Sequence, residues 1–301
     1  NNGDLYVKGY LANDEPAMSA GTGTLYLNGA AAQALNGTQV FKTNNLVTDN
    51  SSGITLNNDL SVGGAHTYTT GFIHSSATPN YLIYEAGSSH SGSNDSRHST
   101  GWVKKNGNTD FTFPVGDNTY LRTVALSGIS VSSEFNCHYY IPTQNIYNLN
   151  TGIVKVKNNE YWQVDKVSGG SAQVTLNWDH AKVPMDNIAL SDIVAGHYTG
   201  GLWSDGGGTA TGNVTTTGTV TSGSISSFSP FTLAYRSFPI PLKLLSFTGW
   251  RRSGITYLHW VTESEQDVKR FSIQRSFDGN TFTEIGSVNA RNRGIRELYN
   301  F

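Results

Sequence analysis

The stretch that decides the fold is Gly53-Ile54-Thr55-Leu56-Asn57-Asn58-Asp59-Leu60-Ser61-Val62-Gly63, in which short apolar runs alternate with Asn and Gly corners. Similar runs precede it at spacings of 20 and 21 residues, and they are Leu5-Tyr6-Val7, Leu25-Tyr26-Leu27 and Leu46-Val47. Short strands that recur about every 20 residues, with polar corners between them, are typical of a parallel β-helix or a related solenoid. The repeat therefore predicts a β-solenoid over residues 1–97.

A solenoid coil is too thin to bury its own apolar face, so successive coils must stack on one another. We therefore expect the apolar residues of the repeat to point into the stack, while Asn and Thr line the corners. The side chains predicted to lie inside are Leu25, Leu27, Leu46, Ile54 and Leu56. The alternative is a plain β-sandwich whose strands are joined by Asn-Gly hairpins.

The composition of the whole chain indicates an all-β protein. Its 301 residues include 33 glycines and 8 prolines, and polar residues separate many short apolar runs. Only 14% of the residues are charged and the formal net charge is −2, so nucleic acid or an anionic membrane is not expected as a partner. No apolar run approaches the roughly 18 residues of a membrane-spanning helix. The single cysteine, Cys137, lies in an alternating strand and is predicted to be a buried small apolar side chain.

Residues 86–100 are rich in Ser and Gly and predict a solvated connector loop. The loop holds His90, Asp95, Arg97 and His98, which could form a metal or ligand site. The two histidines lack the compact spacing of a metal-binding motif, so the connector is the favoured interpretation.

Residues 98–237 predict a second domain, a β-sandwich. Asn106-Gly107 indicates a hairpin turn near its start. Alternating strands are expected over Tyr120–Leu126, Phe135–Ile141, Glu160–Asp165, Gln173–Asp179 and Ser227–Leu233. Phe238-Pro239-Ile240-Pro241 predicts a stiff linker to a third segment, residues 238–301.

The third segment also indicates strands separated by turns. They are expected near Leu244–Phe247, Tyr257–Val261, Phe271–Arg275 and Thr281–Val288, with a further strand beginning at Tyr299. Asp278-Gly279-Asn280 predicts the turn of a hairpin.

The run from Pro239-Ile240-Pro241-Leu242 through Leu258-His259-Trp260 to Asp278-Gly279-Asn280-Thr281-Phe282 resembles the fibronectin-III-like module that precedes the sorting domain of type IX secretion substrates. Residues 22–72 and 101–117 are similar to repeats and to a following motif of the same secreted proteins. The resemblance implies a large secreted or surface-attached bacterial protein, exported by the type IX machinery, and it implies that the chain is a segment of something longer.

A fibronectin-like sandwich needs about seven strands. Because residues 238–301 provide about five, we expect a truncated module with an open sheet edge and an apolar groove. Continuation of the chain would fill the groove, or a strand from a neighbouring copy would fill it and cause self-association.

No specific catalytic constellation is present: there is no nucleophile elbow, HExxH motif, phosphate loop or cysteine pair. Polysaccharide lyases and hydrolases also use solenoids, but between Leu25 and Ile73 the acids are only Asp49 and Asp59. We therefore expect no enzymatic activity, with a solenoid polysaccharide lyase or hydrolase as the weaker alternative.

Two kinds of ligand remain open. Calcium could bind carboxylate and amide oxygens at Asp14-Glu15, Asn57-Asn58-Asp59 or Asp117-Asn118, although Asn and Asp in turns usually serve the backbone. A glycan could bind exposed rings, and His197-Tyr198-Thr199-Gly200-Gly201-Leu202-Trp203 offers Tyr198 and Trp203 beside a Gly-rich loop. We predict Trp203 to be the more exposed of the two.

The favoured function is that of a secreted or cell-surface structural or adhesive protein, acting as a stalk or filament-like interaction module. A polysaccharide-binding module is the alternative. The expected location is the bacterial cell surface or its exterior, with a cell-surface partner or glycan as the ligand.

Overall fold

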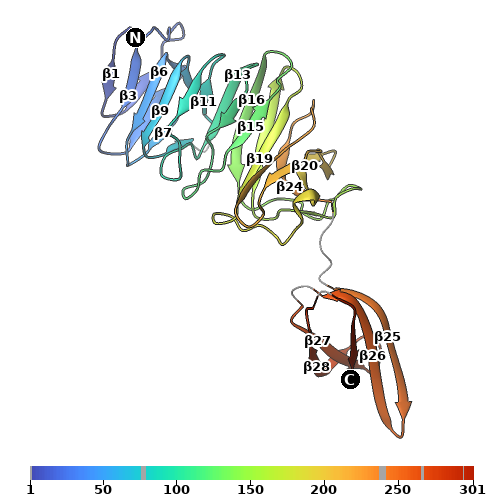
Figure 1. Cartoon of the computed structure of the whole chain (residues 1–301). Helices are drawn as coiled ribbons and strands as arrows, with labels where there is room; N and C mark the ends of the chain where they lie inside the picture. Colours follow the sequence, from blue (N-terminus) through green and yellow to red (C-terminus); the bar gives the residue numbers. More distant parts are fainter. Residues whose placement is uncertain (1, 76–78, 237–241, 266–267, 294) are drawn as a thin grey trace. The chain divides into compact units, whose positions relative to one another are not determined.

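The computed structural model describes residues 2–75, 79–236, 242–265, 268–293 and 295–301. Apart from the short 3₁₀ helix η1 (Leu190–Asp192), every regular element in these ranges is a strand. The chain divides into two compact units, Asn1–Phe238 and Pro239–Phe301. The predicted fold class, all-β with an N-terminal solenoid, is confirmed (Figure 1). The predicted linker at residues 238–241 lies outside the described residues.

The N-terminal part of the first unit is built of parallel strands stacked as coils (Figure 1). Sheet A contains β1 (Leu5–Val7), β3 (Thr24–Leu27), β6 (Asn45–Asp49), β9 (Ala65–Thr70) and β12 (Ser89–Ser91). Sheet B contains β2 (Leu11–Asn13), β4 (Gln33–Gly37), β7 (Ile54–Leu56) and β10 (Ile73–Ser75). A third sheet, the long sheet, begins with β5 (Phe41–Thr43), β8 (Leu60–Val62), β11 (Tyr81–Tyr84) and β13 (Trp102–Gly107).

The sequence period appears directly in the strand register. Leu5 pairs with Leu25, and Leu25 pairs with Leu46, so the spacings of 20 and 21 residues each correspond to one coil. The five side chains predicted to lie inside are no more than 2% exposed, and they are Leu25, Leu27, Leu46, Ile54 and Leu56. The repeat was therefore interpreted correctly, and the sandwich alternative for this region is wrong.

The solenoid interior also contains a chain of polar groups. Thr48 Oγ1 lies 3.1 Å from His66 Nε2, and His66 Nδ1 lies 2.7 Å from the hydroxyl of Tyr84. The hydroxyl of Tyr68 lies 3.3 Å from that of Tyr84 and 2.8 Å from Ser99 Oγ. All five residues are at most 2% exposed, so each group relies on its neighbours in place of water.

Residues 86–100 are not the solvated connector that their composition predicts. Ser89–Ser91 form strand β12, which pairs in parallel with β9, and His98 is fully buried. The ring nitrogens of His98 lie 2.8 Å from the carbonyl oxygen of Asn94 and 2.7 Å from that of Asp117. A strand that extends an existing sheet is held by backbone hydrogen bonds and does not require apolar side chains. The Ser/Gly composition of residues 86–100 therefore did not indicate β12.

The predicted hairpin at Asn106-Gly107 is also wrong. Both residues belong to β13, and the next strand, β14 (Phe111–Phe113), lies in a different sheet. Gly107 has a φ of 105°, a conformation that glycine adopts readily, and it ends β13 where the chain leaves the long sheet. The Asn-Gly pair therefore marks a crossing between sheets.

The long sheet continues without a break into the sandwich region, where its strands become antiparallel. There it contains β16 (Ser133–Tyr140), β17 (Lys155–Val156), β18 (Tyr161–Ser168), β20 (Ile193–Thr199), β21 (Leu202–Asp205) and β24 (Pro230–Tyr235). The second sandwich sheet contains β14, β15 (Val124–Ser127), β19 (Gln173–Asp179), β22 (Ala210–Gly212) and β23 (Thr217–Thr221).

One hydrophobic core joins the solenoid to the sandwich. It contains Leu25 and Leu46 from the coils, Val103 from β13, and Trp162 and Trp178 from the two sandwich sheets. The predicted segments 1–97 and 98–237 thus lie in one compact unit that shares the long sheet. Cys137 in β16 is 0% exposed, as predicted.

The second unit has two small sheets, which is a sandwich-like arrangement. One is ordered β25 (Leu242–Arg252), β26 (Ile255–Glu265) and β29 (Glu297–Asn300), and the other pairs β27 (Arg270–Ser276) with β28 (Phe282–Asn289). The five strands lie at the predicted places, although β29 begins at Glu297, two residues before the predicted start at Tyr299.

An apolar pocket of about 170 Å³ lies in the second unit, lined by residues that include Leu244, Phe247 and Phe271. Phe247 is 59% exposed and Leu244 is 51% exposed. Self-association through an open edge of this unit stays a prediction.

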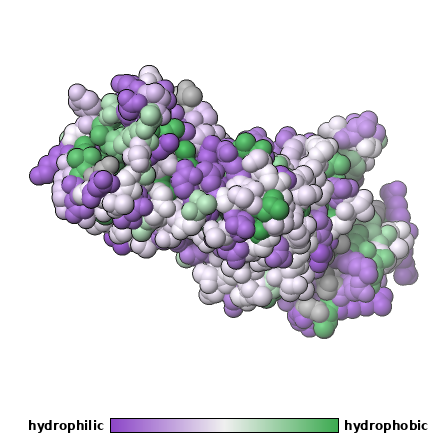
Figure 2. All heavy atoms as spheres, turned by 90° about the horizontal axis from the view of Figure 1, so that it is seen from above, coloured by the Kyte–Doolittle hydropathy of each residue, from purple (hydrophilic) through white to green (hydrophobic). Residues whose placement is uncertain are grey.

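In Figure 2 the hydrophobic residues on the visible face form separate patches among polar residues. Within the described ranges, no helix has the length and apolar character needed to cross a membrane.

Candidate functional site: an aromatic pocket

A pocket of about 110 Å³ lies on the outer face of the long sheet, because its lining residue Tyr161 alternates with Trp162 of the main hydrophobic core. It is lined by Gln144, Asn145, Tyr161, Tyr198, Trp203 and Pro230. Tyr198 in β20 and Trp203 in β21 are direct partners in the antiparallel ladder, and their ring centroids lie 5.2 Å apart at an interplanar angle of 57°. The two residues singled out from the sequence therefore meet in one pocket.

The expectation that Trp203 is exposed is wrong, because its side chain is only 1% exposed. Ile146, Leu149 and Ile153, on the segment before β17, pack against Trp203. Trp203 Nε1 also donates a hydrogen bond of 3.1 Å to the carbonyl oxygen of Gln144. Trp203 also belongs to a small core with Ile153, Val156, Val194 and Ala234. It forms the floor of the pocket, whereas Tyr198 is only partly buried and is accessible from solvent.

Sequence reasoning missed four lining residues: Gln144, Asn145, Tyr161 and Pro230. Tyr161 could have been found, because it alternates with Trp162, which is 0% exposed and points into the core. An inward Trp162 requires its neighbour to point outward. Gln144 and Asn145 lie in irregular structure with no periodic signal, and Asn145 has a φ of 53°.

The lining residues decide which ligands suit the pocket. Three aromatic rings and one proline ring provide apolar walls, while Gln144 and Asn145 supply amide groups that both donate and accept hydrogen bonds. None of the six lining residues is Asp, Glu, Lys, Arg or His. Such a pocket suits a neutral ligand with apolar faces and hydroxyl groups. It offers no carboxylate pair for glycoside hydrolysis.

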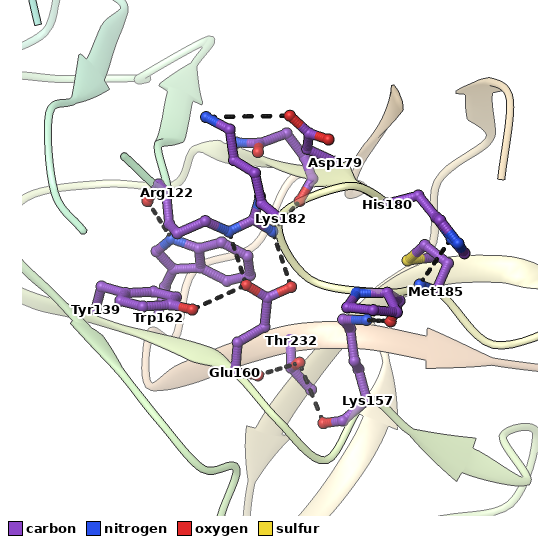
Figure 3. Close-up of polar contacts among 12 residues, drawn as sticks. Arg122, Tyr139, Lys157, Glu160, Trp162, Asp179, His180, Lys182, Met185 and Thr232 are labelled. Atoms are coloured by element: carbon purple, nitrogen blue, oxygen red, sulfur yellow. Dashed lines mark hydrogen bonds and ion pairs between the residues drawn. The ribbon is translucent and has the colours of Figure 1, made fainter. Parts of the chain in front are cut away.

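A second group of polar residues, shown in Figure 3, lies inside the sandwich. Arg122 Nε and Nη2 donate hydrogen bonds of 2.8 Å to the two carboxylate oxygens of Glu160, and both side chains are 0% exposed. The Tyr139 hydroxyl donates to Glu160 Oε2 at 3.1 Å, and Trp162 Nε1 donates to the carbonyl oxygen of Arg122 at 2.7 Å. Burial, with the negative charge of Glu160, raises the pKa of Tyr139.

The partners of this network indicate a structural role. Both oxygens of Glu160 are engaged, and Thr232 Oγ1 donates a hydrogen bond of 2.7 Å to the Glu160 backbone carbonyl (Figure 3). A carboxylate held by a bidentate arginine and a tyrosine has no free oxygen for a substrate proton. We therefore assign the network to sandwich stability.

The acidic residues considered for calcium serve backbone groups. Asp14 Oδ1 accepts from Thr38 N at 2.9 Å, and Asp59 Oδ1 accepts from Tyr81 N at 2.8 Å. Asp117 Oδ1 accepts from the backbone N–H groups of Thr119 and Tyr120 at 2.6 and 2.7 Å. Within the described ranges, no group of three or more His, Cys, Asp or Glu side chains has an arrangement that could hold a metal ion.

Comparisons with known proteins give no relative for this chain: no family model, no curated protein and no solved structure matches it.

Proposed function

We propose that this protein is a non-catalytic adhesive protein of the bacterial cell surface that binds a neutral glycan in the aromatic pocket. The observation that carries the proposal is the pocket itself, in which Tyr161, Tyr198 and Trp203 lie beside the amides of Gln144 and Asn145. Sugars combine apolar C–H faces with hydroxyl groups, and rings next to amide groups complement both.

The first unit suits adhesion because its pocket sits on an extended sheet with a shared core. The long sheet carries β5 of the solenoid at one end and β21, with Trp203, at the other. Binding residues supported by a rigid sheet need less ordering when a ligand binds, which favours affinity. Export by the type IX machinery is part of the proposal and is supported by the sequence resemblance of residues 22–72, 101–117 and 239–282.

Retardation in native gels containing soluble polysaccharide tests the proposal. The neutral panel is hydroxyethyl cellulose, β-1,3-glucan, xylan and galactomannan, and the anionic panel is polygalacturonate and alginate. We expect retardation by at least one neutral polymer, with at least a tenfold loss of affinity in Tyr198→Ala. The control is Tyr147→Ala, because Tyr147 is 89% exposed on the segment before β17 but does not line the pocket.

Absence of retardation by every neutral polymer would refute the proposal, and so would equal retardation of Tyr198→Ala and the native protein. The same polymers test the non-catalytic part. Release of reducing ends or unsaturated products, lost in Asp49→Asn or Asp59→Asn, would show a solenoid enzyme instead.

A further inference from the structure

Tyr161 belongs to the pocket and also to a line of rings that crosses the outer face of the long sheet. We call this line the aromatic row, and it consists of Tyr81, Trp102, His138, Tyr140 and Tyr161. Each of these side chains is partly exposed, whereas Leu82, Val103 and Trp162, which follow three of them in sequence, are 0% exposed. Because side chains alternate along a strand, the row lies on the face opposite the core.

The row is continuous from strand to strand. The ring centroids of Tyr81 and Trp102 lie 6.1 Å apart, and those of Trp102 and His138 lie 5.2 Å apart. His138 stacks on Tyr140 at 4.2 Å, and Tyr140 stacks on Tyr161 at 5.1 Å. The strand register explains this order, since Tyr81 pairs with Trp102 and Tyr140 pairs with Tyr161.

The rings of the row differ in orientation: some are stacked in parallel, and others have no parallel partner. Tyr140 and Tyr161 are nearly parallel, at 16°, so each covers a face of the other. Trp102 is turned by 54° from His138 and by 73° from Tyr140, so its indole faces are not covered by a parallel stack with either ring. Trp102 is therefore better placed to stack on a ligand than His138, Tyr140 and Tyr161, which stack on one another. It is also better placed than Tyr81, whose ring centroid lies 4.6 Å from Lys104 Nζ.

The groups around the rings are polar, with an ion pair and one further carboxylate among them. Lys104 in β13 forms an ion pair of 2.6 Å with Glu134 in β16, and its Nζ lies 4.6 Å from the ring centroid of Tyr81. Gln163 donates a hydrogen bond to Asp165 on β18. A surface of rings, amides, one ion pair and the carboxylate of Asp165 favours a neutral hydroxyl-rich ligand over a polyanion.

We propose that the aromatic row and the pocket form one continuous binding face for an extended neutral polysaccharide chain, which lies across the strands from Tyr198 to Trp102. The inference rests on the proposed function. It adds that the ligand is an extended chain and that Trp102 contacts the end of this chain farthest from Tyr198. β13 and β20 are separated by four strand intervals, β13–β16–β18–β24–β20. At about 4.8 Å per interval, Trp102 and Tyr198 lie roughly 19 Å apart across the sheet, which requires several sugar units.

Isothermal titration with oligosaccharides of two and six units, prepared from the neutral polymer that retards the protein, tests this face. The six-unit chain is expected to bind at least about tenfold more tightly than the two-unit chain, because it engages both ends together. Trp102→Ala is expected to remove this advantage and leave two-unit binding unchanged, whereas Tyr198→Ala weakens both. Tyr26→Ala is the matched control, since Tyr26 is an outward ring stacked on Tyr6 at 4.3 Å in sheet A.

The outcomes separate the two proposals. Two-unit binding that depends on Tyr198, with no gain for six units or no effect of Trp102→Ala, would refute the extended face and leave the pocket intact. Absence of binding to any polymer would refute both. Trp102→Phe, which keeps a ring over the sheet, is expected to retain part of the gain and thereby separates ligand contact from loss of folding.

Discussion

Arg122 and Glu160 form a bidentate ion pair in which both side chains are 0% exposed, with Nε–Oε2 and Nη2–Oε1 distances of 2.8 Å. Arg122 lies shortly before β15 of the second sandwich sheet, and Glu160 immediately precedes β18 of the long sheet. The pair therefore links the two sheets of the sandwich through groups that have no access to water.

Removal of one partner of this pair leaves a buried charge without compensation. Arg122→Met is expected to lower the free energy of unfolding by about 3–5 kcal/mol, and Arg122→Met combined with Glu160→Leu is expected to recover part of that loss. Urea unfolding measures both. Arg236→Ala is the control, since the side chains of Arg236 and Asp205 are 45% and 23% exposed, and such a pair contributes about 0–1 kcal/mol. A single variant as stable as native protein would contradict the structural role.

The alternation in β6 predicts opposite results for two neighbouring residues. Leu46 is 0% exposed inside the solenoid, and Val47 points outward and is partly exposed. Leu46→Asp is expected to unfold the solenoid, because an unpaired buried charge costs at least several kcal/mol. Val47→Asp is expected to change stability by less than about 1 kcal/mol. Circular dichroism during thermal unfolding distinguishes them, and equal melting curves would show that the inward assignment of Leu46 is wrong.

The pH dependence of stability should reflect the buried histidine of the solenoid. Burial, and secondarily His90, lowers the pKa of His66 well below its ordinary value. Below a pH of about 6.5 the unfolded chain binds a proton that the native chain does not. Protonation of His66 in the unfolded chain therefore does not affect stability above a pH of about 6.5. Below that pH, the free energy of unfolding decreases as the pH falls toward the lowered pKa of His66. Burial acts in the same direction on His197, whose pKa falls to about 4.

His66→Phe tests the effect of His66 on the pH dependence of stability, because it keeps an aromatic ring but removes the group that binds the proton. The variant loses the contacts with Thr48 and Tyr84, so it is expected to be less stable at pH 8. Its stability should nevertheless fall less steeply than that of native protein between pH 7 and pH 5. Urea unfolding at several pH values gives both slopes, and parallel curves would show that His66 does not contribute.

Substitution of two glycines with similar φ angles can distinguish the cost of backbone strain from the cost of a steric clash at the solenoid corners. Gly71 has a φ of 75°, and a Cβ there would lie 1.8 Å from the carbonyl oxygen of Asn50. Gly87 has a φ of 85°, and nothing lies within 4 Å of its Cβ position. Gly87→Ala is expected to cost about 1–2 kcal/mol from the left-handed backbone alone. Gly71→Ala should cost clearly more, and equal unfolding midpoints would contradict the close contact between coils.

The solenoid could be predicted because its information is local and repeated. Leu25 and Leu46 recur at the length of one coil, and the register then places them on top of each other. The strands of the second unit could also be predicted from the sequence, since β26 and β27 alternate apolar and polar residues between clear turns. Strand β12 and the crossing after Gly107 were missed, because Ser/Gly and Asn-Gly segments have the same composition in a loop, a hairpin or a coil.

The sequence by itself determined that this chain is all-β, that its first coils stack, and that residues such as Trp162 and Cys137 face a core, because alternation and period act between neighbours in the chain. Only the tertiary structure decided that Trp203 is buried beneath the segment that holds Gln144, and that Tyr161 joins Tyr198 in one pocket. It also decided that Tyr81, Trp102 and Tyr140 align across strands. These relationships depend on which strands become neighbours in the sheet, and strand order is set by the packing of the whole unit.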